Sequence, residues 1–330
     1  MISNIFKLIN GLYVVIATFL LFIVLKPFIL IVNTIFSKDT YENFVLFLIK
    51  STNYFFVLQR YNSIEGNKYK YDIRKYRDVY DRQGTELFFR FLSPEKIIKN
   101  KSILDVGCGV GGKDLELLRY NPKNITGIDL SSRNIKFANE LINKSNENIL
   151  RFLNTDLFNL EENNIFDTIL SYTVFEHIDK RMLLPILNKM YSLLKPNGYV
   201  VIVFNHYDDK YGMHLKEYIY HPWPQIIFEE QLLYKYWNMQ FNNDKNINEN
   251  SYFPIEYNHG IQNHNMDCFM NLNKVTVNEF EKIIKRTGFV LYKNHFYSKS
   301  ILLKIFPFLP NKYLIGSVVY NLKKNSASII

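Results

Sequence analysis

The pattern of apolar and polar positions divides the chain into a hydrophobic beginning and a regular alternation that starts near Lys101. From there, short apolar runs bounded by turn residues alternate with amphipathic segments, which predicts an α/β domain with a mainly parallel sheet. Ser131 is placed to cap the second predicted helix. The predicted strands are 103–106, 125–130, 149–152, 166–171 and 198–204, and the predicted helices lie near 113–120, 132–144 and 180–194.

The beginning of the chain has a different character. Eighteen residues from Leu8 to Leu25 carry no charge, and a second apolar stretch runs from Phe28 to Phe36. Eighteen such residues reach the lower limit for a membrane-spanning helix. As one helix, residues 8–36 would measure about 43 Å, more than a hydrocarbon core of roughly 30 Å, so we expect a tilt, a fold-back or a break at Pro27. The sequence predicts a membrane-attached N-terminus; a buried helix of a soluble domain is the alternative.

Composition narrows the classes of protein. Apolar residues make up 48% and aromatic residues 16% of the chain, enough to form a core and to exclude overall disorder. Two cysteines, 160 positions apart, exclude a disulfide-stapled scaffold and indicate a reducing compartment. The net charge of +9 permits an anionic partner, either nucleic acid or a lipid surface.

A glycine-rich turn follows the first predicted strand, reading Asp105-Val-Gly-Cys-Gly-Val-Gly-Gly112. Glycines are needed where a strand turns sharply into a helix and the backbone approaches a ligand closely. Gly107, Gly109 and Gly112 also satisfy the dinucleotide-binding fingerprint, with Asp129 at about the expected distance. The turn therefore predicts a nucleotide-like ligand and leaves its type open.

Three acids stand at the ends of successive strands, where ligands of open α/β sheets bind. Asp105 is placed to hold an ammonium group, Asp129 to bind two ribose hydroxyls, and Asp156 to accept from an adenine amino group. With these motifs in order, residues 101–204 resemble a class I S-adenosylmethionine-dependent methyltransferase. The pattern resumes at 275–289 with a last helix and its glycine cap, followed by strands near 290–297 and 313–322.

The resemblance implies a Rossmann-like α/β fold, with a seven-stranded, mostly parallel sheet sandwiched by helices and an inserted lid. The hydrophobic N-terminal helical segment, expected from residues 8–36, precedes this fold. It also implies S-adenosylmethionine as cofactor. By resemblance, the methionine part falls to Asp105 and the glycines, the ribose to Asp129 and the adenine to Asp156. The cofactor-binding residues expected on this basis are Asp105, Gly107, Cys108, Gly109, Gly111, Asp129, Leu130, Asp156 and Leu157.

Four residues are candidates for the acceptor side of the site. Glu176 and His177 follow the fourth strand, His206 follows the fifth, and His221 lies in an aromatic, proline-broken loop. We expect one histidine, His206 or His221, to be a base; the alternative for all four is a structural role. The histidines have no regular ligand spacing, so no metal is predicted.

The chain is accordingly divided into a hydrophobic segment 1–60, a methyltransferase core 61–205 and 275–330, and a substrate lid 206–274. We expect methyl transfer to a small, lipophilic acceptor at a membrane, with the catalytic domain cytoplasmic because Lys and Arg follow the apolar segment. Nucleic acid is not expected, since residues 171–176 lack the Asp/Asn-Pro-Pro-aromatic motif of base-amino methyltransferases. The alternatives are a methyltransferase for a soluble metabolite, a nicotinamide-dependent oxidoreductase, and a non-catalytic tethered partner.

Overall fold

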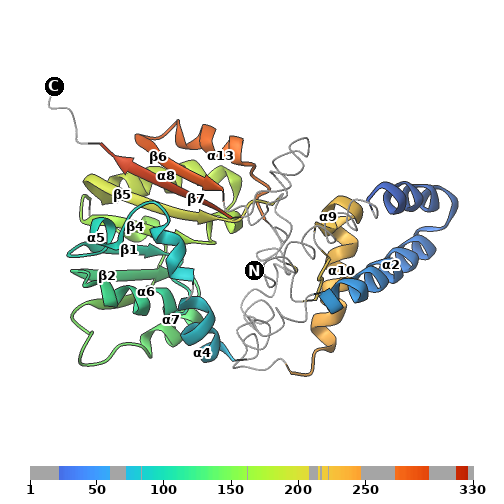
Figure 1. The fold of residues 1–330 in the computed structure, drawn as a ribbon, viewed down its shortest axis with the longest axis horizontal. Helices are drawn as coiled ribbons and strands as arrows, with labels where there is room; N and C mark the ends of the chain where they lie inside the picture. The colour runs from blue at the N-terminus through green and yellow to red at the C-terminus, as the bar shows by residue number, and fades with distance from the viewer. Residues whose placement is uncertain are drawn as a thin grey trace, which may run out of the picture. The chain divides into compact units, whose positions relative to one another are not determined.

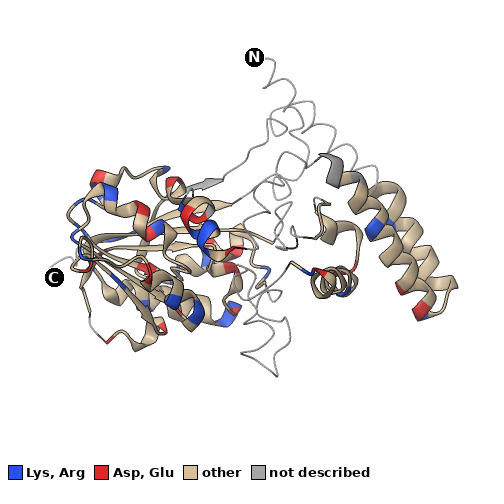
Figure 2. Ribbon diagram, turned by 90° about the horizontal axis from the view of Figure 1, so that it is seen from below, with Lys and Arg blue, Asp and Glu red and all other residues tan. Residues whose placement is uncertain are grey.

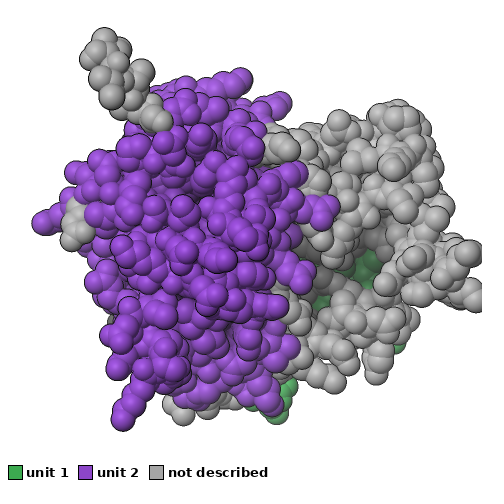
Figure 3. Space-filling model, turned by 60° about the vertical axis from the view of Figure 1, so that its left-hand side comes forward, with its two compact units in different colours: residues 1–68, 208–248, 298–316 green, residues 69–207, 249–297, 317–330 purple. Residues whose placement is uncertain are grey.

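The chain forms two compact units (Figure 3). We call residues 69–207, 249–297 and 317–330 the sheet unit, and residues 1–68, 208–248 and 298–316 the helical unit. The predicted lid is thereby shared, since 208–248 groups with the N-terminal residues and 249–274 with the sheet. The computed structural model describes residues 22–59, 72–82, 84–161, 163–207, 215, 218–221, 223–246, 272–296 and 317–325.

The sheet unit contains seven strands in the order β3-β2-β1-β4-β5-β7-β6 (Figure 1). Strands β1 to β5 are parallel, and β7 runs antiparallel to both of its neighbours. This confirms the predicted seven-stranded, mostly parallel sheet. The strands are β1 (Ser102–Val106), β2 (Asn124–Asp129), β3 (Leu150–Asn154), β4 (Phe166–Tyr172), β5 (Leu194–Phe204), β6 (Phe289–Phe296) and β7 (Val318–Lys324).

Helices cover both faces of this sheet. One apolar cluster joins the strands to the first set of helices, with Phe88, Ile97, Leu117 and Ile135 buried against Ile103. A second, aromatic cluster lies under α13, where the Phe280 ring is 4.9 Å from those of both Phe204 and Tyr320. The first set is η4 (Gly84–Phe89), α5 (Pro94–Ile97), α6 (Gly112–Leu117) and α7 (Ser132–Asn139), and the second is α8 (Leu183–Leu193) and α13 (Val277–Ile284).

Side-chain caps begin two of these helices, and the cap at Ser131 is the predicted one. Ser131 Oγ accepts a hydrogen bond from Asn134 N at 3.1 Å and so begins α7. Thr276 and Glu279 form a reciprocal capping box at the start of α13. The fifth strand begins earlier than predicted, at Leu194, because an irregularity between Phe166 and Thr168 lets Leu194 pair before the Lys-Pro-Asn-Gly turn ends.

The helical unit contains helical residues 22–35, α2 (Lys38–Gln59), α9 (Pro224–Ile227) and α10 (Glu230–Asn243). Tyr41, Val45 and Ile49 recur every four residues along α2 and are buried. Tyr41 Oη donates to Glu229 at 2.6 Å, and Lys235 pairs with Glu42 at 2.6 Å, which tie α2 to the start and middle of α10. These contacts explain why residues before 60 and residues after 208 form one unit.

The apolar N-terminus is described only in part. Residues 8–21 of the predicted membrane segment lie outside the described residues, while helical residues 22–35 run through Pro27. The predicted break at Pro27 is therefore wrong. The helix ends at Ile35, and Ser37 Oγ then accepts from Thr40 N at 3.4 Å to start α2. No helix within the described part of the chain has the length and apolar character needed to cross a membrane.

Candidate functional site

The glycine turn between β1 and α6 depends on conformations that other residues rarely adopt. Gly107, Gly109 and Gly111 have φ angles of 74°, 57° and 76°, all in the left-handed region. A Cβ at Gly107 would lie 2.3 Å from Val174 Cγ2, and one at Gly111 would lie 2.6 Å from the Phe152 ring. A Cβ at Gly109 would meet nothing within 4 Å. Two of the glycines are therefore fixed by packing, whereas Gly109 presents open backbone to a ligand.

Asp105 is the last acid of β1 before this turn and is completely buried. Neither of its carboxyl oxygens receives a hydrogen bond from the described residues, and the carboxyl of Asp114 is its neighbour. Burial raises the pKa of Asp105 to about 7, although the Lys113 ammonium opposes the shift. A buried carboxyl without a donor suits an incoming cation, so Asp105 and the open backbone at Gly109 fit the amino-acid part of S-adenosylmethionine.

Asp129 joins the end of β2 to the glycine turn. One of its carboxylate oxygens accepts from Gly109 N at 2.9 Å and the other from Ser131 N at 2.9 Å. The oxygen bonded to Ser131 also accepts from Asn134 Nδ2, at 3.4 Å, whereas the oxygen bonded to Gly109 keeps a second lone pair. The group is only partly buried. Next to it, the apolar side chain of Leu130 is 74% exposed. A carboxylate oxygen with a free lone pair beside an exposed apolar side chain fits a ribose that carries a flat base.

The end of β3 is tied to the same edge. Asn154 Nδ2 donates to the carbonyl oxygens of Asp129 and Leu130 at 3.0 and 2.9 Å. Asp156 accepts from Phe158 N at 2.7 Å and caps a short 3-10 turn, η6 (Leu157–Asn159). The structure thus brings the three predicted acids to the carboxyl edge of three adjacent strands. Leu157 is buried.

Cys108 lies in the core rather than on the open side of the turn. Its side chain is fully buried, and a Cβ at Gly127 would lie 2.9 Å from its sulfur. Burial, followed by the nearby acids Asp114 and Asp105, raises the pKa of this thiol well above its usual value. Cys108 therefore contributes backbone and packing to the site, and its thiol stays protonated.

Glu176 and His177 lie in the 3-10 turn η7 (Phe175–His177) that follows β4. The Glu176 side chain is 2% exposed, and its burial raises the carboxyl pKa to about 8, partly offset by hydrogen bonds that include Asn205. Asn273 fixes the backbone of this turn, because its Nδ2 donates to Phe175 O at 2.6 Å and to Ile178 O at 3.0 Å. Burial therefore favours the neutral form of the Glu176 carboxyl, and Asn273 fixes the backbone of the turn that carries it. His177 is partly buried.

His206 is placed at the carboxyl end of β5, as predicted, but both of its ring nitrogens are engaged. Nδ1 lies 2.8 Å from Val275 O, which can only accept, so Nδ1 carries the proton and Nε2 accepts from Tyr320 Oη at 3.0 Å. Burial lowers the pKa of His206 to about 4. In this arrangement the ring links β5, β7 and the segment before α13, and neither nitrogen is available to a substrate.

His221 belongs to the helical unit, whereas the other candidate residues belong to the sheet unit. It is 1% exposed, and its ring packs 4.6 Å from Phe56 and 6.0 Å from Phe228. This is the surrounding of a core aromatic residue. The prediction that His206 or His221 is a base remains without support from the geometry. No cluster of three or more metal-ligating side chains occurs among the residues that the structure describes.

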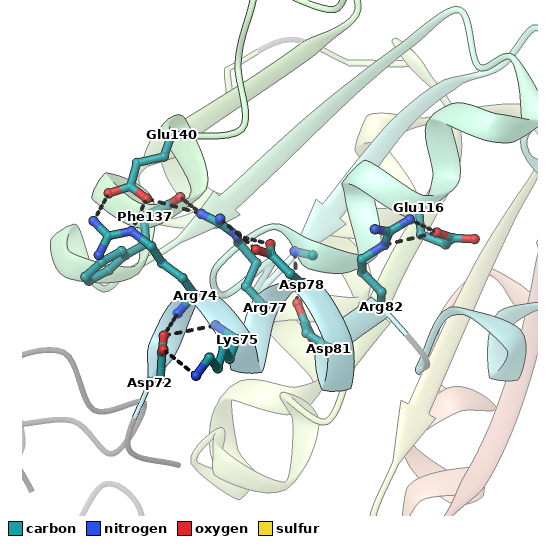
Figure 4. A network of polar contacts seen from close by, with 11 residues as sticks. Asp72, Arg74, Lys75, Arg77, Asp78, Asp81, Arg82, Glu116, Phe137 and Glu140 are labelled. Carbon is teal, nitrogen blue, oxygen red and sulfur yellow. Dashed lines mark hydrogen bonds and ion pairs between the residues drawn. The ribbon is translucent and has the colours of Figure 1, made fainter. Parts of the chain in front are cut away.

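The structure adds a segment that the sequence pattern did not reveal. Residues 72–82, which we call the strap, run across α6 and α7 and contain a π-helix, η3 (Tyr76–Asp81) (Figure 4). Arg77 Nη1 donates to Phe137 O at 2.9 Å, and Arg82 pairs with Glu116 at 2.6 Å. Asp81 accepts from Gly112 N at 2.9 Å and pairs with the buried Lys113.

The strap thus fixes both helices that follow the cofactor-binding strands. Its charged residues look like an ordinary solvated stretch in the sequence. Their partners lie more than thirty positions away, so no local signal could have identified them.

The chain resembles known methyltransferases in sequence. A family model described as a methyltransferase domain matches residues 73–292, more than half of the chain. A sterol 24-C-methyltransferase from Debaryomyces hansenii is 30% identical over 142 residues, covering 41% of this chain and 37% of that protein. A mitochondrial ubiquinone biosynthesis O-methyltransferase from Dictyostelium discoideum is 30% identical over 127 residues, covering 33% of this chain and 39% of that protein.

A phosphoethanolamine N-methyltransferase from Plasmodium falciparum is 27% identical over 168 residues, covering 47% of this chain and 62% of that protein. The chain therefore spans less than two thirds of the length of each of these curated relatives. Among solved structures, an S-adenosylmethionine-dependent methyltransferase from Mesorhizobium loti has a TM-score of 0.43 at 14% identity, over 68% of this chain and 92% of that one.

Proposed function

We propose that this chain, which belongs to the methyltransferase domain family, transfers a methyl group from S-adenosylmethionine to a small lipophilic acceptor at a membrane surface. The observation that carries the proposal is the buried Asp105 beside open backbone at Gly109, with Asp129 on the next strand. Family membership argues against a nicotinamide-dependent oxidoreductase, which the glycine turn alone had left open.

The residues of the chain have separate tasks in this proposal. Asp105 holds the ammonium group of the cofactor, Asp129 accepts from the ribose hydroxyls, and Leu130 covers the base. The cofactor supplies an activated sulfonium methyl, so the protein must mainly align the acceptor and exclude water. Glu176, neutral at pH 7 and held by Asn205, is positioned at the end of β4 to donate a hydrogen bond rather than to act as a ready base.

Two observations support a lipophilic acceptor. The first is that two relatives are a sterol 24-C-methyltransferase and a ubiquinone biosynthesis O-methyltransferase. The second is the surface of residues 22–36, which comprise helical residues 22–35 and Phe36. Apolar side chains predominate there, and the single charged residue, Lys26, donates to Ile226 O at 2.5 Å. Figure 2 shows the charged residues gathered mainly on the sheet unit. The exposed apolar side chains are Phe22, Ile23, Val24, Phe28, Leu30, Ile31, Ile35 and Phe36.

A polar acceptor is the second candidate, because one relative is a phosphoethanolamine N-methyltransferase. The two acceptor classes are separated by incubating the full chain with methyl-labelled S-adenosylmethionine and either a lipid extract or a water-soluble metabolite extract. Label in the lipid phase supports the proposal, and label only in the aqueous phase supports the polar acceptor.

Binding of the cofactor is tested first, by calorimetry with S-adenosylhomocysteine. We expect tight binding to the wild type and a loss of at least about tenfold in Asp129→Ala, since one charge-assisted hydrogen bond contributes about 1.5–3 kcal/mol. Glu147→Gln, an exposed acid of the same unit, is the matched control and should bind like the wild type. Equal binding by Asp129→Ala would contradict the assigned ribose site, and a wild type that binds but transfers no methyl group to any extract would favour a non-catalytic partner.

A further inference from the structure

The cofactor site contains more buried negative charge than the proposed function uses. Asp105, Asp114 and Asp81 are 0%, 0% and 7% exposed, and Lys113, at 5%, is the buried cation among them. Lys113 forms its ion pair with Asp81. The two remaining acids, on β1 and on the first turn of α6, face each other without another donor among the described residues.

Two adjacent carboxylates in a dry site do not both ionise. Taking each charge out of water costs several kcal/mol, and their mutual repulsion adds to that cost. Burial is the largest cause that raises the pKa of Asp114 well above its usual value, and its neighbour Asp105 is the second. A pair of this kind keeps one proton and titrates as a unit.

Five other titratable groups surround the pair, and Lys113 is the one cation among them. The strap contributes Asp81, and α6 contributes Lys113. Burial alone would lower the pKa of Lys113, but the carboxylates of Asp81 and Asp105 raise it. The end of β2 contributes Asp129, the glycine turn contributes Cys108, and β4 contributes Tyr172, whose ring centroid lies 5.0 Å from Lys113 Nζ. None of these supplies a second cation to the pair.

We propose that Asp114 is a further cofactor-site residue, which shares one proton with Asp105 in the cofactor-free enzyme and gives that proton up when a cationic ammonium group binds. The inference rests on the proposed function, because the cation is the ammonium group of the cofactor's amino-acid part. In the exchange, one carboxylic O–H bond breaks, its proton passes to the solvent, and the ammonium group remains protonated. Before binding, the pair is one carboxylate and one carboxylic acid. After binding, it is two carboxylates beside the ammonium group.

This pairing makes the site selective for ligands that carry an ammonium group. S-adenosylhomocysteine has that group, whereas 5′-methylthioadenosine has the same base, ribose and sulfur but no amino-acid part. The two ligands therefore separate the contribution of the acid pair from that of the ribose and adenine contacts.

The test is calorimetry at about pH 6 in two buffers of different ionisation enthalpy, which counts the protons released on binding. For the wild type we expect about one proton released per S-adenosylhomocysteine and close to none for 5′-methylthioadenosine. The affinity for S-adenosylhomocysteine should rise by up to about tenfold per pH unit between pH 5 and 7. In Asp114→Asn, the proton release and this pH dependence should both be lost, whereas the control Glu147→Gln should behave like the wild type.

The outcomes separate this inference from the proposed function. Tight binding of S-adenosylhomocysteine with no proton release would overturn the acid pair while leaving the proposed function intact. Equal proton release by both ligands would also overturn it, because the proton would then come from elsewhere. If neither ligand bound, the proposed function and the inference would fail together. The comparison of ligands uses the wild type alone, so it decides the matter even if Asp114→Asn does not fold.

Discussion

At the scale of single residues, the three glycines of the turn have similar φ angles but different surroundings. Val174 packs against Gly107 and Phe152 packs against Gly111, whereas a side chain at Gly109 would meet open space. The sequence predicted the whole turn, because the strand, the glycines and the helix start are contiguous. It could not distinguish the glycines needed for packing from the one that presents backbone to a ligand.

This difference predicts opposite effects of the same substitution. Gly107→Ala should destabilise the fold by more than about 3 kcal/mol, because left-handed strain is added to a severe overlap. Gly109→Ala should cost only about 1 kcal/mol of stability yet weaken binding of S-adenosylhomocysteine, since the methyl group occupies the open side of the turn. Urea unfolding and calorimetry measure the two quantities; a Gly109→Ala variant that binds normally would refute the assigned approach to the turn.

A second prediction concerns Glu176 and pH. The unfolded chain releases this proton near the ordinary value of 4.5, but the native protein keeps it up to about pH 8. The native state therefore binds more protons across that window, and stability falls as the pH rises, by at most about 1.4 kcal/mol per pH unit. Glu176→Gln should remove this fall. The free energy of unfolding of the variant, measured in urea, should therefore rise relative to that of the wild type from pH 5 to 8. Parallel pH profiles for the two proteins would show that Glu176 is not held neutral.

At the scale of elements, the strap shows why parts of the site escaped prediction. Strands, caps and the glycine turn depend on residues close in sequence, and these were predicted. The strap depends on Asp81 reaching Gly112 and Lys113, and on Arg77 reaching α7. The acid pair was missed for a related reason, because Asp114 stands in the sequence as one more charged residue of a helix and only its burial distinguishes it.

The strap is expected to contribute stability through one contact above all. Asp81→Asn leaves the buried Lys113 without its ion pair and should cost about 3 kcal/mol. Arg74→Ala is the matched control on the same strap. Its pair with Glu140 is largely exposed, so its loss should change the stability much less. The free energy of unfolding in urea tests both; equal small losses would mean that the strap does not hold α6.

At the scale of the whole molecule, charge and apolar surface are combined in one chain. The net charge is +9, and residues 22–36 expose apolar side chains. The first attracts an anionic lipid surface and is weakened by salt, whereas the second is insensitive to salt. Both properties could be predicted from the sequence, because the charge and the apolar N-terminal stretch are read directly from it. The acceptor could not be predicted in the same way, because it depends on how side chains are arranged around the methyl group.

Flotation with vesicles separates these contributions. We expect stronger binding to phosphatidylglycerol than to phosphatidylcholine vesicles, with the difference shrinking in high salt. The double substitution Ile31→Glu and Ile35→Glu should reduce binding to both kinds of vesicle, while Asn43→Glu, at an exposed polar position of α2, should have little effect. Undiminished binding by the double variant would show that this helix does not contact lipid.

The strand order has a consequence for how the protein is made. β6 pairs with β7 and with no other described strand, and β7 in turn fills the place between β6 and β5. During synthesis, β6 therefore emerges with no neighbour to join, and both it and the edge of β5 stay unpaired until residues up to Lys324 have left the ribosome. In that interval the growing chain presents open strand edges, which are prone to pair with other chains. A chaperone that binds the nascent chain would be needed most in that interval.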